Sequence, residues 1–105
     1  MARAQHRLVL GMSFGTKEMT KYYFVYLLES MQDNFLYVGF TEDVTLRLEK
    51  HNGGQVVSTK NHRPYRMIYY EAHLSKADAL RREKYLKTSK GKTTIRTMLN
   101  SYFAS

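Results

Sequence analysis

The sequence predicts an α+β domain in which helices pack against a small mixed sheet, in the order β-β-α-β-α-α. At 105 residues the chain fits one domain and can bury a modest core. Short runs rich in aromatic and β-branched residues predict three strands, at 21–30, 35–40 and 65–73. Apolar residues spaced by three and four predict helices after the second and third strands.

The first two strands are expected to form an antiparallel hairpin. Residues 21–30 (KYYFVYLLES) are apolar on both faces, which is typical of a central strand covered on each side. The sequence MQDN supplies turn residues before the second strand, at 35–40 (FLYVGF). Gly39 interrupts this strand pattern, and an internal glycine indicates a bulge or a close approach to the backbone.

A helix is predicted to follow and to run to about His51. We expect Thr41 to cap it, with two acids in its first turn, Glu42 and Asp43. Spacings of three and four place four residues on one face, namely Val44, Arg47, Leu48 and His51. Arg47 and His51 should therefore project together, beside apolar contacts.

The second half of the chain adds a strand and two helices. Residues 52–64 have the glycines, polar residues and proline of an exposed loop, which carries Ser58, Thr59, Lys60, His62 and Arg63. The strand at 65–73 comes next. Ser75 and Asp78 predict the start of a helix at 76–87. We expect the sequence SKGK to interrupt this helix, and residues 93–103 to form the last one.

The charge of the chain favours a polyanionic partner, and nucleic acid is the obvious candidate. Seventeen Lys and Arg against nine Asp and Glu give a net charge of +8 and a pI near 9.8. The cations gather in one stretch, at Arg81, Arg82, Lys84, Lys87, Lys90, Lys92 and Arg96. A solvated helix face would show the same pattern, so both interpretations stay open.

Several classes of protein are excluded or disfavoured. The chain has no cysteine, which excludes disulfides, thiolate zinc sites and cysteine nucleophiles. The longest apolar run, Tyr22 to Leu28, is far too short for a membrane span, and we expect a soluble, cytoplasmic protein. Residues 1–20 show no sustained period, so we expect a disordered leader followed by one domain at 21–105.

Glu83 is an acid on a face that should be apolar. It lies three residues after Leu80 and four after Ala79, in the stripe that Leu86 continues. A buried carboxylate needs a partner, because leaving it unpaired costs several kcal/mol. Two interpretations stay open. Glu83 either binds a metal ion or forms a structural ion pair, for which the candidate partners are Arg47, Arg66 and Lys87.

Tyr26, Tyr37, Arg47 and His51 each have a simple structural explanation. Tyrosines often pack with the hydroxyl at the core edge, a histidine can stabilise a helix end, and an arginine can be solvated or ion-paired. The set is more informative than its members. An aromatic hairpin, an Arg/His helix face and an inward acid could converge, and these residue types together suit phosphodiester hydrolysis.

These residues resemble the GIY-YIG nuclease family, and most of all its small standalone bacterial members. The two signature tripeptides correspond to Phe24-Val25-Tyr26 and Tyr37-Val38-Gly39. Arg47, His51 and Glu83 follow in the family's order. Phe24 stands where the family has glycine, which should alter strand packing and not chemistry. The resemblance spans Tyr22 to about Asn100 and implies a three-stranded antiparallel sheet flanked by helices.

The resemblance implies a metal-dependent DNA endonuclease. Glu83 would hold one Mg²⁺ or Mn²⁺ ion, and Arg47 would bind the scissile phosphate. Tyr26 and Tyr37 would orient the attacking water, with His51 as a proton relay. The sequence does not decide which tyrosine is the base. Gly39 would let substrate or the arginine helix lie close to the sheet.

We expect the remaining cations to contact the phosphate backbone without sequence choice, at Lys60, Arg63, Arg81, Arg82, Lys84, Lys87, Lys90 and Lys92. A monomer is expected, although a dimer is possible. The alternative is a catalytically inactive nucleic-acid binding module with the same fold. A third interpretation is a structural protein whose aromatic sheet face docks a partner. The fold alone does not name the substrate.

Overall fold

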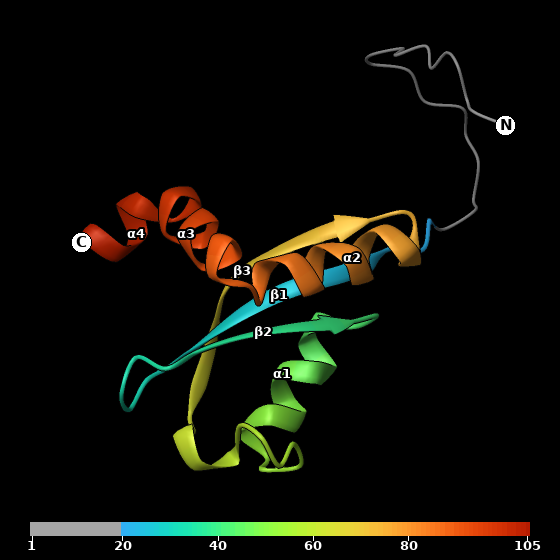
Figure 1. The fold of residues 1–105 in the computed structure, drawn as a ribbon. Coiled ribbons are helices and arrows are strands. Elements are labelled where there is room, and N and C mark those ends of the chain that lie inside the picture. Colours follow the sequence, from blue (N-terminus) through green and yellow to red (C-terminus); the bar gives the residue numbers. More distant parts are fainter. Residues whose placement is uncertain (1–19) are drawn as a thin grey trace, which may run out of the picture.

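The computed structural model describes residues 20–105, so the predicted leader lies almost wholly outside the described residues. The elements follow one another as β1 Tyr23–Ser30, β2 Leu36–Thr41, α1 Val44–Asn52, the 3-10 turn η1 Lys60–His62, β3 Tyr65–His73, α2 Lys76–Leu86, α3 Ser89–Met98 and α4 Asn100–Ala104 (Figure 1). The α+β prediction is confirmed, with one more helix than expected because the last predicted helix divides at Leu99.

The strands form one antiparallel sheet in the order β2-β1-β3, which confirms that β1 is central. Tyr26 in the middle of β1 lies opposite Gly39 on β2 and Tyr70 on β3. Residues that lie opposite each other in an antiparallel pair point to the same side of the sheet. The register therefore places Tyr26 and Gly39 on one face, together with Tyr37, which lies opposite Leu28.

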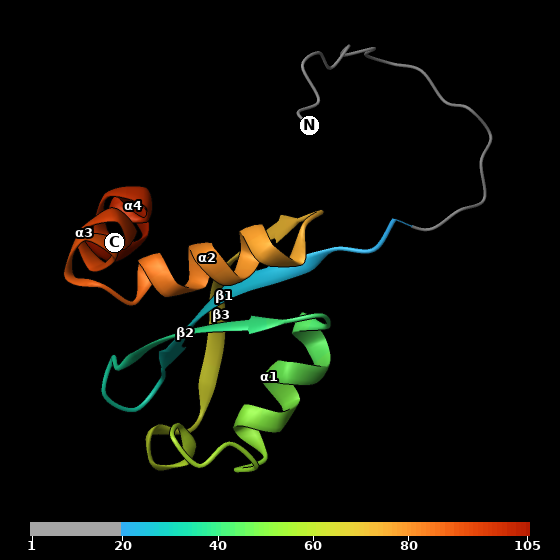
Figure 2. The same cartoon turned by 45° about the vertical axis from the view of Figure 1, so that its right-hand side comes forward.

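The two faces of the sheet are covered by different helices (Figure 2). On the α2 face, Val25 and Leu27 pack with three residues of the C-terminal helices, Ala79, Leu86 and Ile95. On the α1 face, Tyr26 and Leu28 pack with Tyr65, and partly buried side chains that include Tyr37 and Leu48 cover them. Alternation of side chains along β1 thus divides the core into an aliphatic half and an aromatic half.

The start of α1 differs from the prediction by two residues. Asp43, not Thr41, is the N-cap, because its extended backbone lets the carboxylate accept from the N–H of Leu46 at 3.0 Å. The Thr41 hydroxyl accepts instead from the N–H of Asp43. The predicted cap of α2 is confirmed, since the Ser75 hydroxyl accepts from the N–H of Asp78.

The sequence SKGK does not separate the last helices as predicted, because it forms the first turn of α3. Thr88 caps α3 by accepting from the N–H of Gly91 at 3.0 Å. Gly91 is buried, and a Cβ there would overlap the carbonyl of Tyr85 and the backbone of Leu86. Glycine is therefore needed for close packing of two helices rather than for a break in one.

Within the part of the chain that the structure describes, no helix is long and apolar enough to cross a membrane.

Candidate active site

Tyr26 is the centre of a buried polar cluster on the α1 face. Its hydroxyl lies 2.8 Å from Nε2 of His51 and accepts from Nε of Arg47 at 3.3 Å. Arg47 and His51 lie on one face of α1, as their spacing predicted, and this face is turned to the sheet. Burial raises the pKa of Tyr26 to about 12, against the smaller effect of the Arg47 hydrogen bond, so the phenol is protonated at neutral pH.

Gly39 makes room for the Tyr26 side chain. A Cβ at position 39 would overlap the Tyr26 hydroxyl and its ring. The close approach predicted at this glycine exists, but the phenol makes it, and Gly39 itself is buried. Gly39 therefore has a packing role in the site, while the approach of substrate or of the arginine helix to Gly39 stays a prediction.

His51 is completely buried and hydrogen-bonded through both ring nitrogens. Nε2 meets the Tyr26 hydroxyl, and Nδ1 lies 2.7 Å from Oγ1 of Thr59. Burial, and to a smaller extent the positive charge of Arg47, lower the pKa of His51 to about 4. The imidazole is therefore neutral at pH 7, with one ring nitrogen as a hydrogen-bond donor and the other as an acceptor.

Thr59 is the member of the cluster that sequence reasoning missed. It lies in the segment predicted to be an exposed loop, yet it is completely buried, and its hydroxyl also lies 3.3 Å from the carbonyl of Val56. The loop folds back beneath α1, and the Tyr65 hydroxyl donates to the carbonyl of Thr59 at 2.9 Å. Polar composition indicated a loop but could not show that one hydroxyl faces the histidine.

Tyr37 connects the buried cluster to the edge of the sheet. Its ring centroid lies 5.1 Å from that of His51 and 6.3 Å from that of Tyr26. Nζ of Lys87 lies 5.7 Å from the same ring centroid. Tyr37 belongs to the edge strand β2, and Lys87 is the C-cap of α2. Their contact therefore joins side chains from the two faces of the sheet across its β2 edge.

Glu83 lies on α2 at this same edge. Its carboxylate is 3.0 Å from Nζ of Lys87, and its side chain is 20% exposed, so it is half-buried and open to solvent. One of the expected ion pairs is thus present. The predicted stripe is partly wrong, because Leu80 is 41% exposed while Ala79 and Leu86 are fully buried. The carboxylate is close enough to raise the pKa of Tyr26 slightly through its charge.

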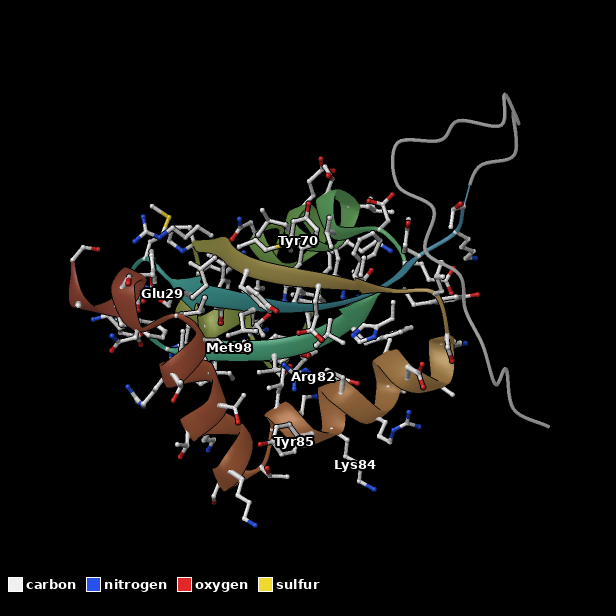
Figure 3. All side chains as sticks on the ribbon, turned by 90° about the horizontal axis from the view of Figure 1, so that it is seen from above. Glu29, Tyr70, Arg82, Lys84, Tyr85 and Met98 are labelled. Atoms are coloured by element: carbon white, nitrogen blue, oxygen red, sulfur yellow. The ribbon has the colours of Figure 1, made fainter. Side chains whose placement is uncertain are left out.

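The structure divides the predicted phosphate contacts into two groups. Arg81 is paired with Asp78, and Arg82 is held by both carboxylate oxygens of Glu71. Figure 3 shows Arg82 on the sheet side of α2 near Met98, where it donates to the sulfur, while Lys84 points away. The other predicted contacts are exposed, and they are Lys60, Arg63, Lys84, Lys87, Lys90 and Lys92.

An open hollow of about 470 Å³ adjoins the edge of β2. Tyr37 and Lys87 belong both to its lining and to the cluster described above. Lys92 and Arg96 line it from α3, so cations border it on two sides. The side of the cluster that holds Tyr37 and Lys87 thus continues into a basic surface.

The residues present suit a single divalent ion at Glu83. No group of three or more His, Asp or Glu lies close enough to form a metal cage within residues 20–105. Magnesium keeps several waters and needs only one or two carboxylates. The Glu83 side chain is 20% exposed, and its one ion-pair partner among the described residues is the flexible side chain of Lys87, so a hydrated ion could reach the carboxylate.

Comparison with known proteins identifies the family of this chain. A model of the GIY-YIG catalytic domain matches residues 22–96. The UPF0213 proteins of Staphylococcus aureus strains Mu3 and N315 are 43% identical over 67 residues, which cover 63% of this chain and 80% of theirs. The solution structure of UPF0213 protein BH0048 from Bacillus halodurans is 31% identical over 73% of this chain and 84% of that one, with a TM-score of 0.47. With the family model covering most of the domain, the chain belongs to the GIY-YIG nuclease family, whose members act on nucleic acid.

Proposed function

We propose that the protein is a metal-dependent endonuclease that hydrolyses phosphodiester bonds in DNA with little sequence specificity. One observation carries this proposal. Tyr26 contacts Arg47 and His51, while Lys87 joins Tyr37 to Glu83, so the five predicted residues form one continuous cluster. The basic surface beside this cluster supplies a path for a polyanion.

Arg47 is the group proposed to bind the scissile phosphate. Its Nε donates to Tyr26, and its two terminal nitrogens form no hydrogen bond or ion pair with another described residue. A planar guanidinium with both ends free can bind two phosphoryl oxygens at once. The hydrogen bond to Tyr26 fixes the direction of this fork, and the positive charge stabilises the negative charge that develops in the transition state.

Glu83 is the group proposed to hold the metal ion, for which Mg²⁺ or Mn²⁺ is suited. The ion, when bound, would supply Lewis-acid stabilisation of the phosphoryl and leaving oxygens. Lys87 neutralises Glu83 in the free protein and can turn to a substrate phosphate when the ion takes its place, because its side chain is half-exposed. The carboxylate thus stays solvated and paired before substrate arrives.

The two phenols and His51 are proposed to accept and transfer the proton of the attacking water. Tyr37 is half-buried at the hollow, whereas Tyr26 is completely buried below Arg47. A phenol can accept a proton from water while it passes its own proton on, and the neutral imidazole of His51 is placed to receive it from Tyr26. Separate Tyr26→Phe and Tyr37→Phe variants would identify which phenol meets the water.

The proposed contacts to flanking phosphates use the exposed lysines rather than the paired arginines. Lys84, Lys90 and Lys92 form no ion pair with another described residue, whereas Arg82 is held by Glu71. Such contacts give affinity without reading bases, which suits structure-selective cleavage in repair or recombination. We propose a monomer as the active form.

The experiment is cleavage of linear, flapped and branched DNAs with and without Mg²⁺. The proposal expects magnesium-dependent cleavage that disappears in Arg47→Ala and Glu83→Ala, while DNA binding largely survives. Binding without cleavage at any metal tested would instead favour the inactive binding module. Absence of both activities would contradict the two nucleic-acid functions together.

A further inference from the structure

We propose that Thr59 is a positioning residue that holds His51 in the tautomer with its proton on Nδ1, so that the Nε2 lone pair faces the Tyr26 hydroxyl. The role of this lone pair as a proton acceptor rests on the proposed function. The tautomer itself does not, because it follows from hydrogen bonds between buried groups.

The direction of the chain of hydrogen bonds is fixed at its first member. Nε of Arg47 can only donate, so the Tyr26 oxygen must accept from it. The hydroxyl proton of Tyr26 then needs an acceptor of its own. Tyr26 is completely buried, and the remaining partner of its hydroxyl among the described residues is Nε2 of His51, at 2.8 Å.

The far end of the chain agrees with this direction. If Nε2 accepts from Tyr26, the ring proton of neutral His51 is on Nδ1 and is donated to the Thr59 oxygen at 2.7 Å. The Thr59 hydroxyl can then donate to the carbonyl of Val56 at 3.3 Å. Every donor in the chain has an acceptor, from the guanidinium of Arg47 to the backbone of the loop.

The opposite direction leaves one buried donor without a partner. With the proton on Nε2, His51 would donate to the Tyr26 oxygen, which already accepts from Arg47. The hydroxyl proton of Tyr26 would then have no acceptor among the described residues. Because an unsatisfied buried donor is costly, the Nδ1–H tautomer is the favoured one.

This chain gives Thr59 a definite task in the proposed reaction. When His51 takes the proton of Tyr26 on Nε2, both ring nitrogens carry protons, and Thr59 still accepts from Nδ1–H. For the case in which Tyr26 is the phenol that meets the water, the O–H bond of Tyr26 breaks and an N–H bond forms on His51. An O–H bond of the water breaks to restore the phenol, its oxygen bonds to phosphorus, and the leaving oxygen departs with the electrons of its bond to phosphorus. Thr59 acts through His51, and it touches neither substrate nor metal.

The test compares Thr59→Ser, which keeps the hydroxyl, with Thr59→Val, which has the same shape without it. The remote Thr97→Val on the exposed side of α3 is the matched control. The ¹⁵N resonances of His51 in metal-free protein report the tautomer directly, and amide spectra report whether each variant is folded. Single-turnover cleavage supplies the functional readout.

We expect the wild type, Thr59→Ser and Thr97→Val to show a protonated Nδ1 and an unprotonated Nε2. Thr59→Val should lose this preference and should cleave about 10- to 100-fold more slowly, with substrate affinity unchanged. A wild-type His51 protonated on Nε2, or a folded Thr59→Val with unchanged tautomer and rate, would overturn the inference. A protein that cleaves nothing but shows the expected tautomers would refute the proposed function alone.

Discussion

The two faces of the sheet are built from the same central strand but hold different chemistry. On the α2 face, Val25 and Leu27 meet aliphatic side chains and carry no polar atom into the core. On the α1 face, Tyr26 alternates with them and enters a buried network with His51 and Arg47. Successive residues of one strand thus supply packing on one side and a hydrogen-bonded site on the other.

The difference separates what stabilises the domain from what we propose it uses for catalysis. Aliphatic burial stabilises the fold without directional constraints, whereas each polar atom of the α1 face needs a partner with suitable geometry. No buried side-chain nitrogen or oxygen among the described residues lacks such a partner. The network is therefore complete before any substrate binds, which favours a preorganised site.

The largest effect on stability is expected on the α2 face. Leu27→Ala should lower the free energy of unfolding by about 2–5 kcal/mol, because it removes a fully buried aliphatic side chain and leaves a cavity. The rate of cleavage per folded molecule should not change. Urea denaturation and single-turnover cleavage at low temperature measure the two quantities, and a large loss of rate in folded Leu27→Ala would contradict the division between faces.

Arg47→Ala should have the converse effect on the α1 face. We expect cleavage to fall about 100- to 1000-fold, which is the usual result of removing one donor to a developing oxyanion. Stability should change little, because Arg47 is only partly buried. Arg81→Ala, which removes an equal charge from an exposed ion pair with Asp78, is the control and should retain wild-type activity.

Acid should weaken the α1 face through His51. The pKa of His51 is about 4 in the folded chain and about 6.5 when it is solvated, so the unfolded state binds the proton first as pH falls. Stability should therefore decrease from about pH 6.5 towards pH 4, by up to about 3 kcal/mol. Urea titrations across this range would measure the loss.

A His51→Gln variant provides the control, because it cannot take up the proton and should show a flatter profile over the same range. Acidic groups with lowered pKa values, such as Glu71 and Asp33, lose their contribution mainly as pH falls below their ordinary values of 4.5 and 3.8, at the acidic end of this window. Identical profiles for the wild type and His51→Gln would show that the histidine is not held neutral by burial.

Alkali should act on the same face through Tyr26. Its pKa is raised to about 12 by burial, so the unfolded chain, with an ordinary value near 10, releases the proton first as pH rises. Stability should therefore decrease between about pH 10 and pH 12, and Tyr26→Phe should remove this part of the decrease. Denaturation midpoints at alkaline pH measure it, and a Tyr26 that ionises near pH 10 in the folded protein would contradict the buried network.

The smallest expected effect concerns the salt dependence of DNA binding. Removing Lys90 and Lys92 together should reduce the slope of log affinity against log salt by about 2, because each phosphate contact contributes about 0.9. Removing Arg81 and Arg82 should change this slope little, since Asp78 and Glu71 already hold them. Equal changes for both pairs would show that the ion pairs open when DNA binds.

Most of the fold could be predicted because local patterns and global packing agree. Aromatic runs located the three strands, and the burial of β1 on both sides followed from its composition. The helical spacing of Arg47 and His51 correctly indicated that the two side chains project together, and both contact Tyr26. Such patterns depend on residues that are near one another in sequence, so one amino-acid sequence is enough to recognise them.

The parts that failed depend on contacts between distant segments. Gly91 looked like a helix breaker, and only the packing of α3 against α2 shows why glycine is required there. Thr59 looked exposed because its loop is polar, yet the loop folds beneath α1 and buries one hydroxyl. Arg82 was predicted to contact phosphate, and its partner Glu71 lies on β3, at a distance in sequence that the helical pattern around Arg82 does not reveal.

The most direct test of the proposed chemistry separates two roles of Glu83. If the carboxylate only pairs with Lys87, then Glu83→Gln and Lys87→Gln should have equal effects, because each removes the same ion pair. If Glu83 holds the metal ion, Glu83→Gln should abolish magnesium-dependent cleavage at saturating protein, while Lys87→Gln should retain most of it. Equal cleavage rates in the two variants would contradict the nuclease mechanism proposed for this site.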